Sequence, residues 1–123
     1  MTIIEAIGII NALKPNNYTE LDKIGWLSEI EQMIKSNIID THEGGENIVF
    51  KGYNQETNTE TQLLVSEPYD DLYIKWLESK IDYHNAEYQK YNNSVMSFNN
   101  IYSAFERYYN RQHKPIQTKL KFF

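Results

Sequence analysis

The sequence predicts a mainly α-helical protein, a small helical bundle with a long C-terminal helix and a short β-hairpin insert. Three stretches carry apolar residues at three-to-four spacing, helix start signals precede them, and a strand-like segment separates the second stretch from the third. With 123 residues and no internal repeat, the chain is expected to form one domain over residues 1–115. The insert is expected at about 46–65, and an extended basic and aromatic tail at 116–123.

The first helix is expected over Ile3–Leu13. Thr2 is followed three residues later by Glu5, which is the spacing of a capping box, where both side chains satisfy free backbone groups at a helix start. Lys14–Pro15 ends the helix, because a residue before proline avoids helical backbone angles. The apolar side of this helix needs a partner to cover it.

The second helix is expected to begin at Thr19 and to run to about Thr41. Thr19 is a favourable capping residue, and Glu20 and Asp22 place negative charge in the first turn, where the helix dipole favours it. The apolar stripe that follows consists of Ile24, Leu27, Ile30, Ile34 and Ile38. This spacing is typical of an amphipathic helix.

The segment between the second and third stretches is predicted to form a small β-hairpin. Gly44–Gly45 interrupts the helical pattern, residues 48–53 have an extended pattern, residues 54–58 are polar turn material, and residues 61–65 are again extended. An isolated hairpin is only marginally stable in water. We therefore expect it to pack on the helices or on a neighbouring chain.

The third stretch begins at Ser66–Pro68, a helix entrance, and carries a long aromatic row. The row keeps an alternating three-then-four spacing and consists of Ile74, Leu77, Ile81, His84, Tyr88, Tyr91, Val95, Phe98, Tyr102, Phe105 and Tyr109. One helix from Pro68 to Asn110 would be about 65 Å long, whereas a compact domain of this size has a radius of gyration of about 14 Å. Either the helix breaks near Asn92–Ser94 or it protrudes and other subunits cover it. Because the spacing is unbroken, we expect a continuous helix or one with a mild kink near Asn92–Ser94.

Composition and charge narrow the possible functions. The chain has no cysteine, which excludes disulfides, thiolate metal sites and cysteine nucleophiles. Residues 1–106 hold seven Lys/Arg against all seventeen Asp/Glu, while residues 107–123 hold five basic residues and no acid. An acidic body repels the phosphate backbone, so specific nucleic-acid binding is not expected. A membrane span and a secretion signal are not expected either.

The candidate chemical motifs are sparse. His84 and Glu87 have the spacing of a helical metal pair, but the sequence has no second copy of this pair, as a carboxylate-bridged metal site would need. Asp70–Asp71 is explained by its place near a helix start. We therefore expect no catalytic, cofactor-binding or metal-binding residues, and a protein that is not an enzyme.

The candidate functional residues are those suited to protein–protein contact. Tyrosine buries a large area and keeps a hydroxyl group for the wet rim of an interface. The predicted interaction residues are Tyr88, Tyr91, Phe98, Tyr102, Phe105 and Tyr109 of the row, with Ile116, Leu120, Phe122 and Phe123 of the tail.

The sequence also resembles small proteins encoded among the head-assembly genes of tailed phages and prophages of Gram-positive bacteria. The segments that carry the resemblance are Glu67–Tyr73, Ile81–Tyr88, Tyr91–Ser94 and Tyr108–Arg111, with Lys14–Asn16 and Asp22–Leu27 upstream. More remotely, the chain is similar to the head-to-tail connector (adaptor) family. This resemblance implies a homo-oligomeric ring beneath the portal vertex, with the portal protein and tail-side connector proteins as partners. The expected location is the virion, and the bacterial host cytoplasm during assembly.

An alternative interpretation uses the basic C-terminal segment. A small DNA-associated regulator would place residues 107–121 on nucleic acid. A sliding-clamp partner would use Gln117–Phe123, which approaches the short peptide that binds such clamps but is one residue short between Leu120 and Phe122. Salt-dependent binding to a DNA duplex would favour the regulator over the connector.

Overall fold

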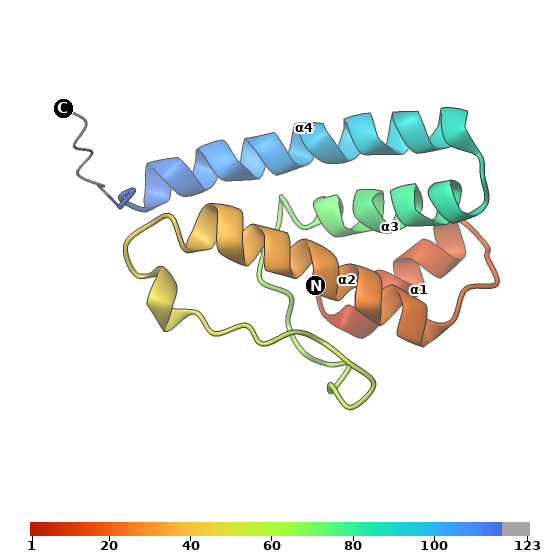
Figure 1. The fold of residues 1–123 in the computed structure, drawn as a ribbon, viewed down its shortest axis with the longest axis horizontal. Helices are drawn as coiled ribbons and strands as arrows, with labels where there is room; N and C mark the ends of the chain where they lie inside the picture. The colour runs from red at the N-terminus through yellow and green to blue at the C-terminus, as the bar shows by residue number, and fades with distance from the viewer. Residues whose placement is uncertain (117–123) are drawn as a thin grey trace.

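The structure is a computed structural model that describes residues 1–116, and this range contains four α-helices. The helices are α1 (Ile3–Leu13), α2 (Glu20–Ile34), α3 (Asp71–His84) and α4 (Tyr88–Gln112). Figure 1 shows α4 along one edge of the molecule with α3 antiparallel beside it, while α2 and α1 cover the other side of α3. The mainly α-helical class is confirmed, with a long C-terminal helix.

The first two helices begin where their capping signals predict. At α1, Thr2 Oγ1 accepts from the Glu5 N–H at 3.2 Å, and the Glu5 carboxylate accepts from the Thr2 N–H at 2.8 Å. Thr19 and Asp22 form the same reciprocal pair at α2. After Ile34, the chain continues as a π-helical turn, η1 (Lys35–Ile39), in which Ile38 and Ile39 are both buried.

The prediction of one continuous helix through the aromatic row is wrong. The chain reverses between α3 and α4 at Asn85–Glu87, and α4 runs unbroken through Asn92–Ser94. Ala86 adopts a left-handed backbone conformation, with φ of 58°. The Ala86 N–H donates to the Tyr83 carbonyl at 3.0 Å, and the Glu87 N–H donates to the Asp82 carbonyl at 2.9 Å. These two bonds form a Schellman motif, which usually has glycine where this chain has alanine.

The reversal folds the aromatic row back on itself. The buried members of the row are Ile74, Leu77 and Ile81 on α3 and Phe98, Phe105 and Tyr109 on α4. The reversal therefore removes the conflict between the length of a single helix and the size of a compact domain. For these positions, the expectation that other subunits cover the row is wrong. Because α4 has 25 residues and α3 has 14, the C-terminal part of α4 extends beyond the start of α3.

The predicted β-hairpin is not present. Residues 46–65 contain no strand, and their regular structure is limited to part of the 3-10 turn η2 (Gly45–Asn47) and a single β-bridge between Gln62 and Thr2. The backbone of this segment pairs with the N-terminus, because the Leu63 N–H donates to the Met1 carbonyl at 3.0 Å and the Ile3 N–H donates to the Thr61 carbonyl at 3.1 Å. The two stretches of the predicted hairpin, residues 48–53 and 61–65, thus have other partners and do not pair with each other.

The end of the described chain lies along the turn that follows η1. The Glu43 N–H donates to the Lys114 carbonyl at 2.8 Å, and the Ile116 N–H donates to the Thr41 carbonyl at 2.9 Å. The N-terminus and the end of the described chain are therefore both hydrogen-bonded to the segment that connects α2 with α3. In the part of the chain that the structure describes, none of the helices is both long enough and apolar enough to cross a membrane.

Candidate docking grooves

A buried carboxylate lies at the centre of the fold. The Glu31 side chain is fully enclosed on the core face of α2, and its oxygens accept hydrogen bonds from the Tyr53 and Tyr73 hydroxyl groups. The Leu64 N–H donates to the same carboxylate at 2.9 Å. Glu31, Tyr53, Tyr73 and the Leu64 N–H are called the Glu31 cluster below.

The Glu31 cluster is a structural clamp. Burial raises the pKa of Glu31, while the hydrogen bonds from Tyr73, Leu64 and Tyr53 oppose the rise. Burial also raises the pKa of both tyrosines, and the adjacent carboxylate adds to this effect. Glu31 lines none of the grooves described below. The buried carboxylate holds the segment around Leu64 in place.

A second buried carboxylate, Asp82, joins three helices. Lys14, at the end of α1, forms an ion pair with Asp82 of α3, and the Ser94 hydroxyl of α4 donates to the same carboxylate at 2.8 Å. Asp82 itself is fully buried, whereas the Lys14 side chain is partly exposed. The arrangement fixes the corner of the bundle where the chain reverses.

The histidines have structural surroundings. His84 stacks on Trp26 with ring centroids 5.4 Å apart, and its sequence partner Glu87 is paired with Lys90. His42 is buried, and its Nδ1 lies 2.6 Å from the Ile38 carbonyl oxygen. Among residues 1–116, no three His, Asp or Glu side chains come together in a way that could hold a metal ion.

The tryptophan groove lies across α2, α3 and α4 and has a volume of about 520 Å³. Its principal lining residues are Met33, Trp76, Lys80, Tyr83, Tyr91 and Val95. Tyr83 is 52% exposed and Met33 is 37% exposed, so the apolar lining faces solvent. Lys80 lies over the Trp76 ring, 4.8 Å from its centroid. An apolar groove between helices is a suitable surface for a helix of another protein.

The tyrosine groove lies under the C-terminal half of α4, where that helix extends past the start of α3. It has a volume of about 270 Å³. Its principal lining residues are Ile39, Ile48, Tyr69, Phe105, Tyr108 and His113. The Tyr69 and Tyr108 rings lie 5.0 Å apart, and Glu67 is an acidic residue of the lining.

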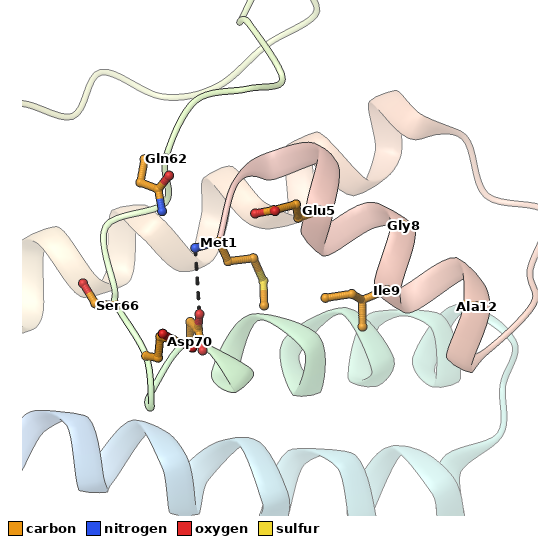
Figure 2. A pocket seen from close by; sticks show the side chains of 9 residues that line it. Met1, Glu5, Gly8, Ile9, Ala12, Gln62, Ser66 and Asp70 are labelled. Atoms are coloured by element: carbon orange, nitrogen blue, oxygen red, sulfur yellow. Dashed lines mark ion pairs between the residues drawn. The ribbon is translucent and has the colours of Figure 1, made fainter.

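The N-terminal groove, with a volume of about 740 Å³, is lined by small and acidic residues of α1 and of the segment before α3. Figure 2 shows the Met1 amino group directed at Asp70, with Glu5 and Ile9 of α1 beside the same space. The Met1 nitrogen lies 3.8 Å from Asp70 Oδ2. With Glu5 and Asp70 in its lining, this groove is unsuited to phosphate groups.

The structure divides the predicted interaction residues into three groups. Phe98, Phe105 and Tyr109 are buried in the core of the single chain and each also lines a groove, so their contact role stays a prediction. Tyr91 and Tyr102 are half-buried, while Tyr88 and Ile116 are exposed. The remaining predicted residues, Leu120, Phe122 and Phe123, lie outside the described residues.

Two important residues are absent from the predicted interaction residues. Glu31 is one, although a signal for it exists, since it lies four residues after Leu27 and three before Ile34 on the apolar stripe. A carboxylate at such a position must find buried donors. Tyr83 falls beside the row and carries no comparable signal.

The fold and its grooves thus define an all-α bundle with apolar surfaces between helices. No family model, curated protein or solved structure matches the chain.

Proposed function

We propose that this chain is a non-catalytic assembly protein, the head-to-tail connector of a tailed phage. In this role it forms a ring of identical copies at the portal vertex and links the capsid to the tail in the virion. The partners are the chain itself, the portal protein and tail-side connector proteins. The resemblance of its sequence to head-assembly proteins supports the proposal.

The observation that carries the proposal is the tryptophan groove. Its lining combines Trp76, Tyr83 and Tyr91 with the flexible side chain of Met33, which is the residue chemistry enriched at protein interfaces. Its charged lining residue, Lys80, is paired with Glu29 at 3.1 Å. In this proposal, a second copy of the chain occupies the groove. A helix of that copy packs against the groove, and the same contact repeats from copy to copy until the ring closes.

The experiment compares two methionine-to-lysine variants. Met33→Lys places a charge in the tryptophan groove, whereas Met96→Lys changes a residue that is 64% exposed on α4 and lies outside the grooves. Each variant and the unaltered chain are mixed with the portal protein encoded by the same genome, and native mass spectrometry measures the assemblies. We expect Met33→Lys to weaken assembly at least about 10-fold, since a charge buried at an interface costs more than 1.4 kcal/mol.

The control and the contradicting results are distinct. Met96→Lys is expected to assemble as the unaltered chain does. Equal assembly by both variants would remove the tryptophan groove from the proposal. Failure of the unaltered chain to form rings with the portal protein would overturn the connector function itself. Binding to a DNA duplex that weakens with salt would instead favour the regulatory alternative.

A further inference from the structure

The tyrosine groove is a concave aromatic surface that the described residues leave open. α4 continues past the beginning of α3, so one side of its last turns has no helix to pack against. The walls of the groove come from Tyr69 and Tyr108, and apolar side chains such as Ile48 line it further. Tyr108 is 37% exposed although its ring contacts Tyr69. Covering this surface with apolar side chains would therefore be favourable.

The described chain ends close to this groove. His113 lines it and stacks on Tyr109 with ring centroids 3.9 Å apart. Only two residues separate His113 from Ile116, where the hydrogen bond to Thr41 fixes the backbone. The seven residues of the segment 117–123 reach up to about 23 Å from that point when extended. This reach is sufficient to return to the groove.

The segment 117–123 also has matching chemistry. It contains Leu120, Phe122 and Phe123, whose side chains suit an aromatic groove, and two lysines, Lys119 and Lys121. The groove offers Glu67 to a positive charge. A short tether gives an attached segment an effective concentration on the order of 1 mM, so weak individual contacts are enough.

We propose that the tyrosine groove binds the chain's own C-terminal segment, residues 117–123, through its terminal phenylalanines. The segment then packs on Tyr69 and Tyr108 and secures the end of α4 to the segment that precedes α3. This inference does not depend on the connector function, because it concerns a contact within one chain. The same segment of a second copy is the competing occupant.

Engineered cysteines can test the contact, because the chain has none of its own. The test variant carries Ser66→Cys, at an exposed lining residue of the groove, and Lys121→Cys. The control carries Val49→Cys, at an exposed residue next to Ile48 but outside the groove, and the same Lys121→Cys. Both variants keep Tyr69, Tyr108 and the two terminal phenylalanines. Disulfide formation requires the two Cα atoms to come within about 7 Å, so the reaction rate reports occupancy of the groove.

The measurement is the rate of disulfide formation in the full chain under a mild oxidant, followed by non-reducing electrophoresis and mass spectrometry. Circular dichroism first verifies that both variants are helical. We expect the groove pair to form an intramolecular disulfide at least about 10-fold faster than the control pair. Equal rates would overturn the proposal, and disulfide-linked dimers as the main product of the groove pair would assign the segment to a second copy.

A charge substitution provides a second readout that leaves the groove walls intact. In the groove-pair background, Glu67→Lys is expected to slow intramolecular disulfide formation about 3-fold at low salt, with a smaller effect at high salt. The matched change Glu60→Lys, at an exposed residue outside the groove, is expected to leave the rate unchanged. Identical rates for the two substitutions would contradict a role for Glu67 in holding the segment.

Discussion

The α3–α4 hairpin and the irregular segment 48–70 cover the same core in opposite ways. The two helices satisfy nearly all their backbone groups internally. The irregular segment depends on side chains from other elements, since the Tyr53 N–H donates to Ser28 Oγ at 3.0 Å and the Val65 N–H donates to the Tyr73 hydroxyl at 2.9 Å. The comparison teaches that the irregular segment owes its conformation to a few polar groups distant in sequence, whereas the hairpin depends on packing and one tight corner.

The largest effect is expected where the irregular segment depends on the Glu31 cluster. Glu31→Ala leaves the hydroxyl groups of Tyr53 and Tyr73 and the Leu64 N–H without their acceptor. We expect the free energy of unfolding to fall by about 4 kcal/mol, because each buried donor left unpaired costs about 1–3 kcal/mol. Urea denaturation measures this change.

The neighbouring residue supplies the control for this prediction. Gln32→Ala changes an exposed position of the same helix and is expected to alter the free energy of unfolding by less than about 0.5 kcal/mol. Similar values for the two alanine variants would mean that the cluster does not hold the segment.

The corner of the hairpin gives a smaller effect of opposite sign. Ala86→Gly relieves a left-handed residue and is expected to stabilise the chain by about 1 kcal/mol. The same substitution at Ala104, in the middle of α4, is expected to destabilise it by about 1 kcal/mol. Thermal unfolding of both variants checks the contrast, and a loss of stability in Ala86→Gly would show that the corner carries no strain.

The smallest effect concerns pH. Burial raises the pKa of Glu31 above its ordinary value of 4.5, so the folded chain binds this proton more tightly than the unfolded chain does. The stabilisation that comes from this tighter proton binding is therefore complete below pH 4.5 and is lost as the pH rises through the raised pKa of Glu31. Glu31→Gln lacks this titration. We expect the stability of the unaltered chain, measured relative to Glu31→Gln, to fall as the pH increases from 4.5. A constant difference across this range would contradict the prediction.

The sequence predicts those features of the fold whose signals are local. The bounds of α1 and the start of α2 follow from capping residues within one helical turn. No glycine or proline indicates the reversal at Asn85–Glu87. The apolar spacing continues across it because each of the two helices turns its own apolar face to the core. The β-hairpin prediction fails because Leu63 and Val65 alternate for burial on the helices and not for pairing with another strand.

The sequence names only part of the residues that line the tryptophan groove. Tyr91 and Phe98 were predicted as contact residues, and both line the tryptophan groove, although Phe98 is buried at its base. The remaining lining comes from α2 and α3, and only the antiparallel packing of α3 and α4 brings these residues together. Periodicity within one helix contains no information about that packing. The contact role of all the predicted interaction residues, Leu120, Phe122 and Phe123 included, stays a prediction.

The attachment of the N-terminus and of the end of the described chain to the segment between α2 and α3 has a mechanical consequence. A stretching force applied to residues 1 and 116 would load two short sets of backbone hydrogen bonds, those of residues 1–4 and those of residues 114–116. The bonds of residues 114–116 lie outside the helices, whereas those of residues 3 and 4 lie at the start of α1. We therefore expect the pairing of residues 114–116 to separate before any helix is extended.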